Sequence, residues 1–154
     1  DNDFEVRVID NLSGGHERNL AHRNSDRRLH FEKADICNLE SDNNLFRGAK
    51  FVFHFAGIGD IVPSIEHPIA YMQTNIQGTI RVLEASRSAR IEKFVYAASS
   101  SCYGLASTPT REDHNIDPQY PYALSKYQGE QAVFHWHQVY GLPVNSIRIF
   151  NRPI

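Results

Sequence analysis

The sequence is poor in several features that would place it in a special class of protein. Its two cysteines, Cys37 and Cys102, form no CxxC pair, which excludes a disulfide framework and favours reduced thiols. No apolar run approaches the roughly 18 residues of a membrane-spanning helix, and the first residues lack the basic and apolar segments of a signal peptide. We therefore expect a cytoplasmic protein that does not cross or bind a membrane.

A marked excess of charge is also absent. Sixteen Lys and Arg residues stand against eighteen Asp and Glu residues, so the formal net charge is −2 at pH 7. A broad cationic surface of the kind that binds nucleic acid is therefore not expected. With 154 residues, 41% of them hydrophobic, and no internal repeat, the chain fits one globular domain with a small-molecule partner.

Methionine is nearly absent as well. The chain begins with Asp1, and its single methionine is Met72. Because an unprocessed translation product begins with methionine, we expect these 154 residues to be an internal segment of a longer protein.

What is present is a regular alternation of strand and helix patterns. Runs rich in β-branched and aromatic residues predict strands at residues 4–9, 29–34, 51–55, 94–98 and 144–150. Apolar spacings of three and four, together with capping residues, predict helices at residues 38–47, 68–87 and 122–140. This alternation, with nearly continuous apolar strands, predicts an α/β fold in which a parallel sheet has helices on both faces.

In such a sheet, ligands bind beyond the carboxyl ends of the strands. The residues at those ends are Asp10, Asp35, 55–57, 99–101 and Asn151. A carboxylate at the end of the second strand of a dinucleotide-binding fold accepts hydrogen bonds from ribose hydroxyls. For Asp10, this function and the capping of a turn are equally compatible with the sequence.

Tyr122 and Lys126 are four residues apart, so both side chains lie on one face of the predicted helix at 122–140. A lysine ammonium beside a tyrosine hydroxyl favours the phenolate and lowers a pKa that is about 10 in free tyrosine, so that the phenol can act as a base. Random placement produces this spacing in roughly one such sequence in five, so the spacing alone is weak. The serine cluster at 99–101 adds hydroxyl groups that can hold a substrate.

A series of short motifs makes the chain resemble the extended short-chain dehydrogenase/reductase family, and within it the nucleotide-sugar 4-epimerases. The motifs are VIDNLS at 8–13, ADI at 34–36, FHFAG at 53–57, NIQGT at 75–79, YAASSSCYG at 96–104, PYALSK at 121–126 and RIFN at 148–151. They occur in the family's order from about Glu5 to Asn151, and that order is far more specific than any single motif. The resemblance implies a Rossmann-like fold.

The resemblance also implies a role for each matching position. Catalysis would be carried out by Ser99, Tyr122 and Lys126. The cofactor NAD would be bound by Asp10, Asn11, Asp35, Ile36, Phe55, Ala56, Gly57, Asn75, Tyr122, Lys126 and Phe150. The substrate, a UDP-sugar or related nucleotide sugar, would contact Ser100, Ser101 and Asn151.

The implied reaction is NAD-dependent epimerisation of a nucleotide sugar at C4 through a 4-keto intermediate. Related dehydratases follow the site serine or threonine with an acidic residue, whereas the run SSSC at 99–102 contains none, which favours an epimerase. Alternatives are a nucleotide-sugar 4,6-dehydratase, a UDP-glucuronate epimerase and, in another class, a non-catalytic binding or assembly module. The full-length protein would be a homodimer.

The chain departs from the family's pattern at the glycine-rich turn that binds the cofactor pyrophosphate. Gly57 and Gly59 follow a predicted strand, but the third glycine would fall at position 62, which is Val62. The family's first strand lies between the strands that here end at Asp10 and Phe55, so we expect a split hydrogen-bond ladder. We interpret residues 1–154 as a partial NAD-binding Rossmann domain without the C-terminal sugar-binding domain, with little epimerase activity of its own.

Metal and thiol chemistry have weaker support. His135 and His137 are two residues apart and point to different sides of the predicted helix, so no metal site is expected. Cys102 follows the serine cluster, but no histidine lies near it in sequence, and we interpret it as a small buried thiol.

Overall fold

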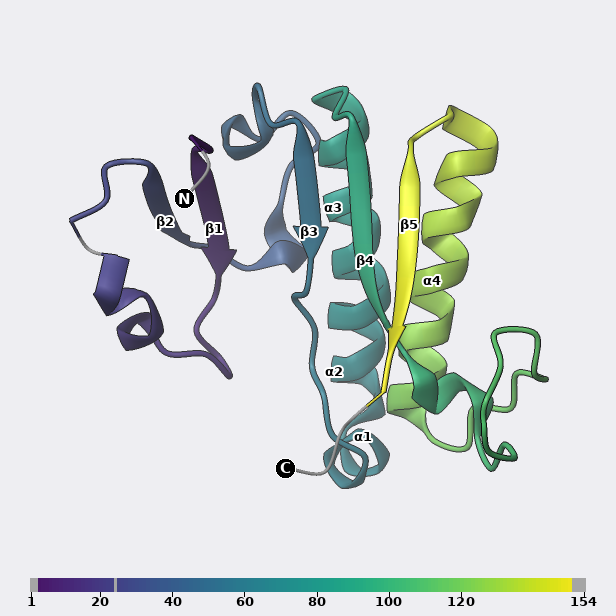
Figure 1. Ribbon diagram of the computed structural model, residues 1–154. Coiled ribbons are helices and arrows are strands. Elements are labelled where there is room, and N and C mark those ends of the chain that lie inside the picture. The colour runs from purple at the N-terminus through teal and green to yellow at the C-terminus, as the bar shows by residue number, and fades with distance from the viewer. Residues whose placement is uncertain (1–2, 24, 151–154) are drawn as a thin grey trace.

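The computed structural model describes residues 3–23 and 25–150, and it confirms the predicted α/β fold (Figure 1). The strands are β1 (Val6–Asp10), β2 (Leu29–Lys33), β3 (Phe51–His54), β4 (Lys93–Ser99) and β5 (Val144–Ile149). Each pair of neighbouring strands runs parallel. The strand positions agree closely with those predicted because each run is apolar and bounded by turn residues.

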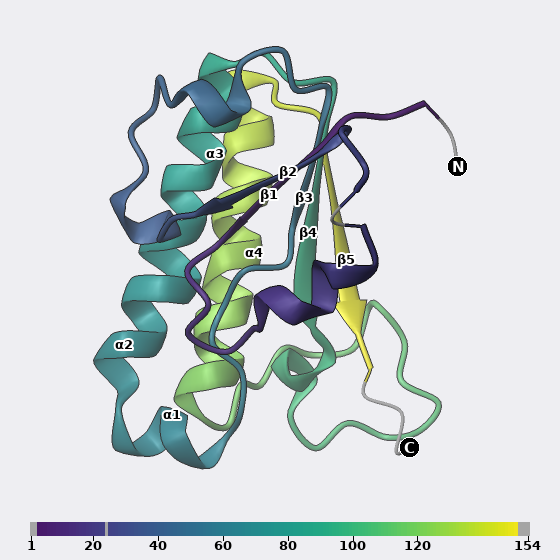
Figure 2. The same cartoon turned by 90° about the vertical axis from the view of Figure 1, so that its left-hand side faces the viewer.

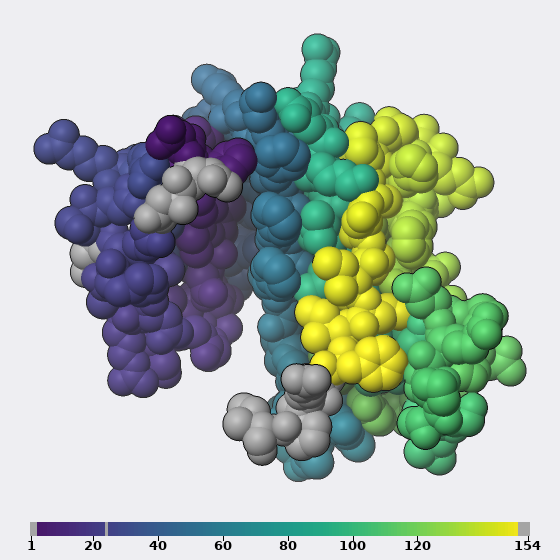
Figure 3. Space-filling model, in the orientation of Figure 1, coloured from purple at the N-terminus to yellow at the C-terminus, as the bar shows by residue number. Residues whose placement is uncertain are grey.

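The strands form two separate parallel sheets. β1 pairs with β2, and β3, β4 and β5 pair in that order. In the described part of the chain no strand joins β1 to β3, so each of these strands has an edge without a ladder partner. The expected split of the ladder is confirmed. In the space-filling view the N-terminal part, in purple, stands apart from β3 along the lower part of this face (Figure 3).

The main helices are α1 (Val62–Glu66), α2 (Pro68–Met72), α3 (Thr79–Ser88) and α4 (Pro121–Tyr140). The π-helical turn η4 (Gln73–Gly78) joins α2 to α3, so the predicted helix at 68–87 is present with one wide turn inside it. The 3-10 helices are η1 (Glu17–Arg23), η2 (Ile36–Asn38), η3 (Asn44–Phe46) and η5 (Ser100–Tyr103).

The helices α2, α3 and α4 lie on one face of the three-stranded sheet (Figures 1 and 2). Crossovers between parallel strands are right-handed. The two crossovers from β3 to β4 and from β4 to β5 advance in the same direction, so both place their helices on the same side. The connection from β1 to β2 contains the 3-10 helix η1.

The predicted helix at 38–47 is wrong. The 3-10 helix η2 ends at Asn38, where this region begins, and the 3-10 helix η3 lies within it. Asp35 accepts a hydrogen bond from the Cys37 N–H at 2.8 Å, and Asn43 accepts one from the Leu45 N–H at 2.9 Å. Each side chain therefore caps its own short turn, and this local bonding competes with a continuous α-helix.

The hydrophobic core lies between the three-stranded sheet and the helices α3 and α4. Its fully buried side chains include Leu83, Phe94, Tyr96 and Val133. This burial fixes which side of each helix faces the sheet. No helix in the described ranges is long and apolar enough to cross a lipid bilayer.

The opposite face of the three-stranded sheet is open and apolar. Phe51, Phe53 and Phe55 alternate along β3 and just beyond it, and they are 46%, 63% and 66% exposed. Ile147 and Ile149 on β5 are also exposed. The strands are therefore apolar on both faces, although the described chain covers one of them.

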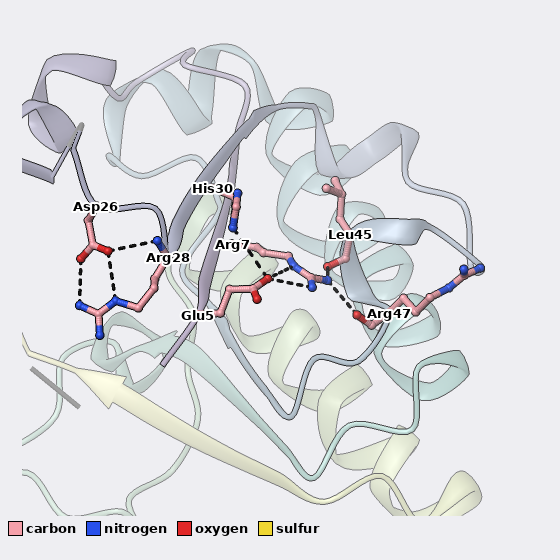
Figure 4. Close-up of polar contacts among 7 residues, drawn as sticks. All are labelled: Glu5, Arg7, Asp26, Arg28, His30, Leu45 and Arg47. Carbon is pink, nitrogen blue, oxygen red and sulfur yellow. Dashed lines mark hydrogen bonds and ion pairs between the residues drawn. The ribbon is translucent and has the colours of Figure 1, made fainter. Parts of the chain in front are cut away.

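Arg7 connects β1 to the rest of the molecule. Its Nη1 atom donates to the carbonyl oxygens of Leu45, at 3.1 Å, and Arg47, at 2.8 Å, at the end of η3, while its other nitrogens pair with Glu5 (Figure 4). In the same view Arg28 pairs with Asp26 within the N-terminal part. Side-chain hydrogen bonds of this kind attach the small sheet, formed by β1 and β2, to the rest of the molecule, because no strand ladder in the described part of the chain does so.

Candidate functional site

Within each sheet the strands end at the same edge because every pair is parallel, and in Figure 1 the strands of both sheets point towards the lower part of the molecule. Asp10 ends β1, Ser99 ends β4, and the segment 55–57 follows β3. Helix α4 begins at this edge with Pro121. The fold thus gathers the predicted site residues from distant parts of the sequence at one end of the sheets.

Asn11 and Asp35 lie together at the ends of β1 and β2. The Asn11 Nδ2 atom donates to Asp35 Oδ2 at 3.1 Å. The bond from the Cys37 N–H, followed by that from Asn11, holds the pKa of the Asp35 carboxyl below its usual value. Asp10 accepts from the Leu12 N–H at 2.7 Å, so it caps a turn, as one of the two readings of the sequence proposed.

Ile36 contributes to the core at this point. Its side chain is 7% exposed, and a Cβ atom on Gly78 would come within 2.6 Å of its Cδ1 atom. The side chain therefore packs against η4. An adenine contact at this position would use the backbone.

Asn75 clamps the loop that follows β3. Its Oδ1 atom accepts from the Ile58 N–H at 2.8 Å, and its Nδ2 atom donates to the Ile58 carbonyl at 3.0 Å and to Ser125 Oγ at 2.9 Å. A Cβ atom at Gly57 would lie 2.9 Å from Asn75 Oδ1, so glycine is required for this close approach. Asn75 itself is buried in the wide turn η4.

Tyr122 and Lys126 lie one turn apart at the start of α4, as predicted. The Ser125 hydroxyl donates to the Tyr122 carbonyl at 2.8 Å, which ties this turn to Asn75. The Tyr122 ring stacks on Tyr120, with ring centroids 6.5 Å apart. The backbone turn that carries both candidate catalytic residues is therefore fixed to the loop after β3.

Lys126 is 6% exposed, and its Nζ atom lies 4.5 Å from the centroid of the Tyr96 ring. Burial lowers the pKa of Lys126 to about 8, and the charge of Glu130 acts in the opposite direction. A Cβ atom at Gly57 would lie 3.7 Å from Nζ, so the ammonium borders the loop after β3. The Lys126 side chain makes no hydrogen bond with the described residues.

The serine cluster continues β4 into η5. The Ser99 Oγ atom lies 2.6 Å from Ser101 Oγ and accepts from the Ser101 N–H at 3.2 Å, so the two hydroxyls are paired. Ser100 is half-buried between them. Ser99 therefore caps η5 while its hydroxyl stays at the strand-end edge.

The remaining predicted residues are more exposed. Phe55 is 66% exposed on the open side of β3, and Ala56 is half-buried next to it. Phe150 is 57% exposed and stacks on Tyr103, with centroids 6.5 Å apart. Asn151 lies outside the described residues.

The sequence did not predict the ion pair between Arg148 and Glu130, which supports the segment that carries the serine cluster. Arg148 on β5 donates to both carboxylate oxygens of Glu130, at 2.8 to 3.1 Å, and to the Tyr103 hydroxyl at 2.6 Å. Ser146 also donates to Glu130. This network ties η5, β5 and α4 together. The i, i+4 spacing of Lys126 and Glu130 was visible in the sequence, but the true partner on β5 was not.

The described residues contain no group of three His, Cys, Asp or Glu side chains that could hold a metal ion. His137 is engaged with the carbonyl oxygen of Leu142 at 2.8 Å. Cys102 is buried, and that burial raises the pKa of its thiol, so the thiolate is disfavoured.

The chain belongs to the NAD dependent epimerase/dehydratase family, whose model matches residues 1–152. The resemblance stated from the motifs is thereby confirmed, and with it the NAD-dependent character of the family.

Similar proteins include epimerases and dehydratases. The chain is 32% identical to a UDP-glucose 4-epimerase of Rhizobium meliloti over 96% of the chain and 44% of that protein. It is 30% identical to a UDP-glucuronate 4-epimerase of Thermodesulfobacterium geofontis over 94% of the chain and 47% of that protein. The structure of the dTDP-glucose 4,6-dehydratase DesIV from Streptomyces venezuelae with NAD and TYD bound superposes with a TM-score of 0.89 at 31% identity, over 94% of the chain and 45% of DesIV. The chain spans about half the length of the curated relatives it matches.

Proposed function

We propose that the chain is the NAD-binding and catalytic portion of an enzyme that inverts the configuration at C4 of a nucleotide sugar. The observation that carries the proposal is the hydrogen-bond network of Asn75, which holds the turn with Tyr122 and Lys126 against the loop after β3. Ser99 ends β4 at the same edge. The three candidate catalytic residues therefore share one end of the sheet.

The residues at this edge fit NAD. Asp10, Asn11 and Asp35 offer carboxylate and amide groups to the hydroxyls of an adenosine. Gly57 leaves the backbone open beside the Lys126 ammonium, so a ribose can approach closely there. When bound, NAD supplies the acceptor and later the donor of the hydride at C4.

The three catalytic side chains would have different tasks. Tyr122 takes the proton of the sugar 4-hydroxyl and returns it after the 4-keto sugar has turned over. Lys126, one helical turn away, places a positive charge beside the phenolate form of Tyr122 and binds a cofactor ribose. Ser99 holds the reacting hydroxyl at the end of β4. The reaction returns every proton and hydride that it takes, so it is redox-neutral overall.

The composition of η5 supports epimerisation over dehydration. Ser100, Ser101 and Cys102 follow Ser99, and no acidic side chain is among them. Related dehydratases carry an acidic residue directly after the site serine or threonine, and this residue removes water from the neighbouring carbons. We propose a UDP-hexose as substrate, with UDP-glucose, UDP-N-acetylglucosamine and UDP-glucuronate as the sugars to compare.

A second candidate function is a binding or assembly module without catalysis. The open apolar face at Phe51, Phe53 and Phe55 and the unpaired edge of β3 favour it, because such surfaces are usually covered by another segment or chain.

The experiment is to incubate the chain with NAD and each of the three UDP-sugars and to separate the products by chromatography. We expect traces of the C4 epimer, since little turnover is expected from the isolated chain. Tyr122→Phe should abolish this trace of product, because the proton acceptor is lost. Tyr127→Phe, on another side of the same helix, is the matched control and should leave the amount of product unchanged.

Binding is measured in parallel by amide NMR with millimolar NAD. We expect shifts at residues 10–13 and 56–58. A 4-keto-6-deoxy product would show that the activity is that of a dehydratase and not of an epimerase. If NAD shifts no amide of the chain, the proposal is wrong and the assembly module is favoured. Full turnover with stoichiometric NAD would contradict the expected weakness of the isolated chain.

A further inference from the structure

The ammonium of Lys126 lies over an aromatic ring. Its Nζ atom is 4.5 Å from the centroid of the Tyr96 ring, which is within the range of a cation–π interaction. Tyr96 is fully buried on β4, and Lys126 is nearly buried on α4. The Lys126 side chain makes no hydrogen bond or ion pair with the described residues, and the Tyr96 ring face is the polarised group in direct contact with Nζ.

Tyr96 is held in this position by the helix above it. Its hydroxyl donates to the Lys126 carbonyl oxygen at 3.3 Å. Residue 129 must be glycine there, because a Cβ atom would overlap the Tyr96 hydroxyl and come within 2.9 Å of the Asn75 carbonyl oxygen. The close approach of α4 to β4 at Gly129 therefore fixes the ring beneath the ammonium.

The titratable groups around Lys126 and Tyr96 do not take over the ring's role of stabilising the ammonium. Burial, and then the charge of Lys126, lower the pKa of His54 on β3 to about 3, so its ring is neutral near pH 7. Glu130 on α4 is engaged with Arg148. Burial raises the pKa of the Tyr96 hydroxyl well above its usual range, so the ring is a neutral phenol.

We propose that Tyr96 is a positioning residue for Lys126: its ring face stabilises the ammonium and holds Nζ beside the loop at Gly57. This inference rests on the proposed function, in which Lys126 acts as the charged partner of Tyr122 and of a cofactor ribose. Burial alone disfavours the charged form of a lysine, and the ring offsets part of that penalty without occupying a proton of the ammonium. The protons remain free to bind a ligand.

The test compares two rings of the same shape. The 154-residue chain is labelled with [¹³C]lysine, and the Cε signal of Lys126 is titrated with pH by NMR. The Lys126→Arg variant assigns the signal, since the sequence holds only three other lysines, Lys33, Lys50 and Lys93. Tyr96→Phe keeps the negative ring face, whereas Tyr96→pentafluorophenylalanine reverses its polarity at nearly unchanged size.

We expect the Phe variant to titrate like the original chain, and the pentafluoro variant to lose roughly one pH unit from the Lys126 pKa. Mono- and difluorinated rings should give intermediate values and serve if the fully fluorinated chain does not fold. Equal Lys126 titration across the folded series would overturn the proposal. The readout is ionisation rather than turnover, so a failure of the proposed function would appear in the product assay and leave this result unaffected.

Discussion

At the scale of single residues, the polar side chains at the strand ends hold their own loops as well as facing the edge. Asp35 caps η2 through the Cys37 N–H and also accepts from Asn11. These bonds favour the carboxylate and hold the pKa of Asp35 below 3.8, the ordinary value. Its contribution to stability is therefore complete above pH ~4 and is lost as the pH falls through the lowered pKa.

We predict that Asp35→Asn lowers the free energy of unfolding by about 1 kcal/mol at pH ~7, because two charge-assisted bonds become neutral or are lost. The difference from the original chain should shrink between pH ~7 and pH ~2.5, because lowering the pH towards the reduced pKa of Asp35 protonates its carboxylate. Urea unfolding at the two pH values measures this. Asp42→Asn, at an exposed position nearby, is the control, and an Asp35 effect of the same size at both pH values would contradict the account.

The individual catalytic candidates were predicted from the sequence because helix periodicity and strand ends are local properties. The spacing of four placed Tyr122 and Lys126 on one helix face, the end of an apolar run placed Ser99 at the strand end, and the family motifs supplied their proposed roles. The bond from Asn75 to Ser125 spans 50 residues and needed the fold. The same is true of Arg148, whose partners Glu130 and Tyr103 lie on two other elements.

At the scale of elements, β1 and β2 are attached to the rest by side chains. Arg7 is the clearest attachment, with its two bonds to the carbonyls of Leu45 and Arg47 at the end of η3. The guanidinium suits this site because it presents several donors in one plane. Without these bonds the small sheet would be held by the chain connection and by the packing of η2 against η4 and α3.

We predict that Arg7→Met speeds hydrogen exchange of the β1 and β2 amides by roughly 5- to 30-fold, since about 1 to 2 kcal/mol of charge-assisted bonding is lost. Amides of β4 in the core should be unchanged. Exchange followed by NMR measures both. The control is Arg28→Met, whose partners Asp3 and Asp26 lie within the same N-terminal part, and equal acceleration in β4 would show that Arg7 acts on the whole fold.

Regular elements were predicted better than irregular ones. The strands and α4 have long apolar patterns with clear boundaries, so local sequence was sufficient. The region 38–47 has a helical spacing, yet Asp35 caps a 3-10 turn that ends at its start and Asn43 caps a second one within it. The wide turn η4 also has no simple pattern, because it is stabilised by the distant bonds of Asn75.

At the scale of the whole molecule, the open sheet face and the unpaired edge of β3 determine how the chain associates with other chains. Phe51, Phe53 and Phe55 expose a row of aromatic rings beside an edge that has free backbone groups. Edges of this kind pair with other chains unless they are covered or charged. The isolated chain should therefore self-associate.

We predict that Phe53→Lys increases the monomer fraction of the 154-residue chain by several-fold at micromolar concentrations, because a charge on the open face of β3 opposes sheet-to-sheet contact. Phe53 is 63% exposed, so the fold itself should lose little stability. Sedimentation velocity measures the association. Leu105→Lys, at a 96% exposed position in the loop after η5, is the control, and an equal effect there would show that net charge alone is responsible.

The sequence by itself determined the order of the strands and helices, the position of each candidate site residue at a strand or helix end, and the family. These depend on local patterns of two to four residues and on motifs that are read without the fold. The tertiary structure alone decided that the helices α2, α3 and α4 cover one face of the three-stranded sheet, that Arg148 pairs with Glu130, and that Tyr96 lies beneath Lys126. These features depend on which distant segments meet, because burial and hydrogen bonding act between surfaces that the chain brings together only on folding.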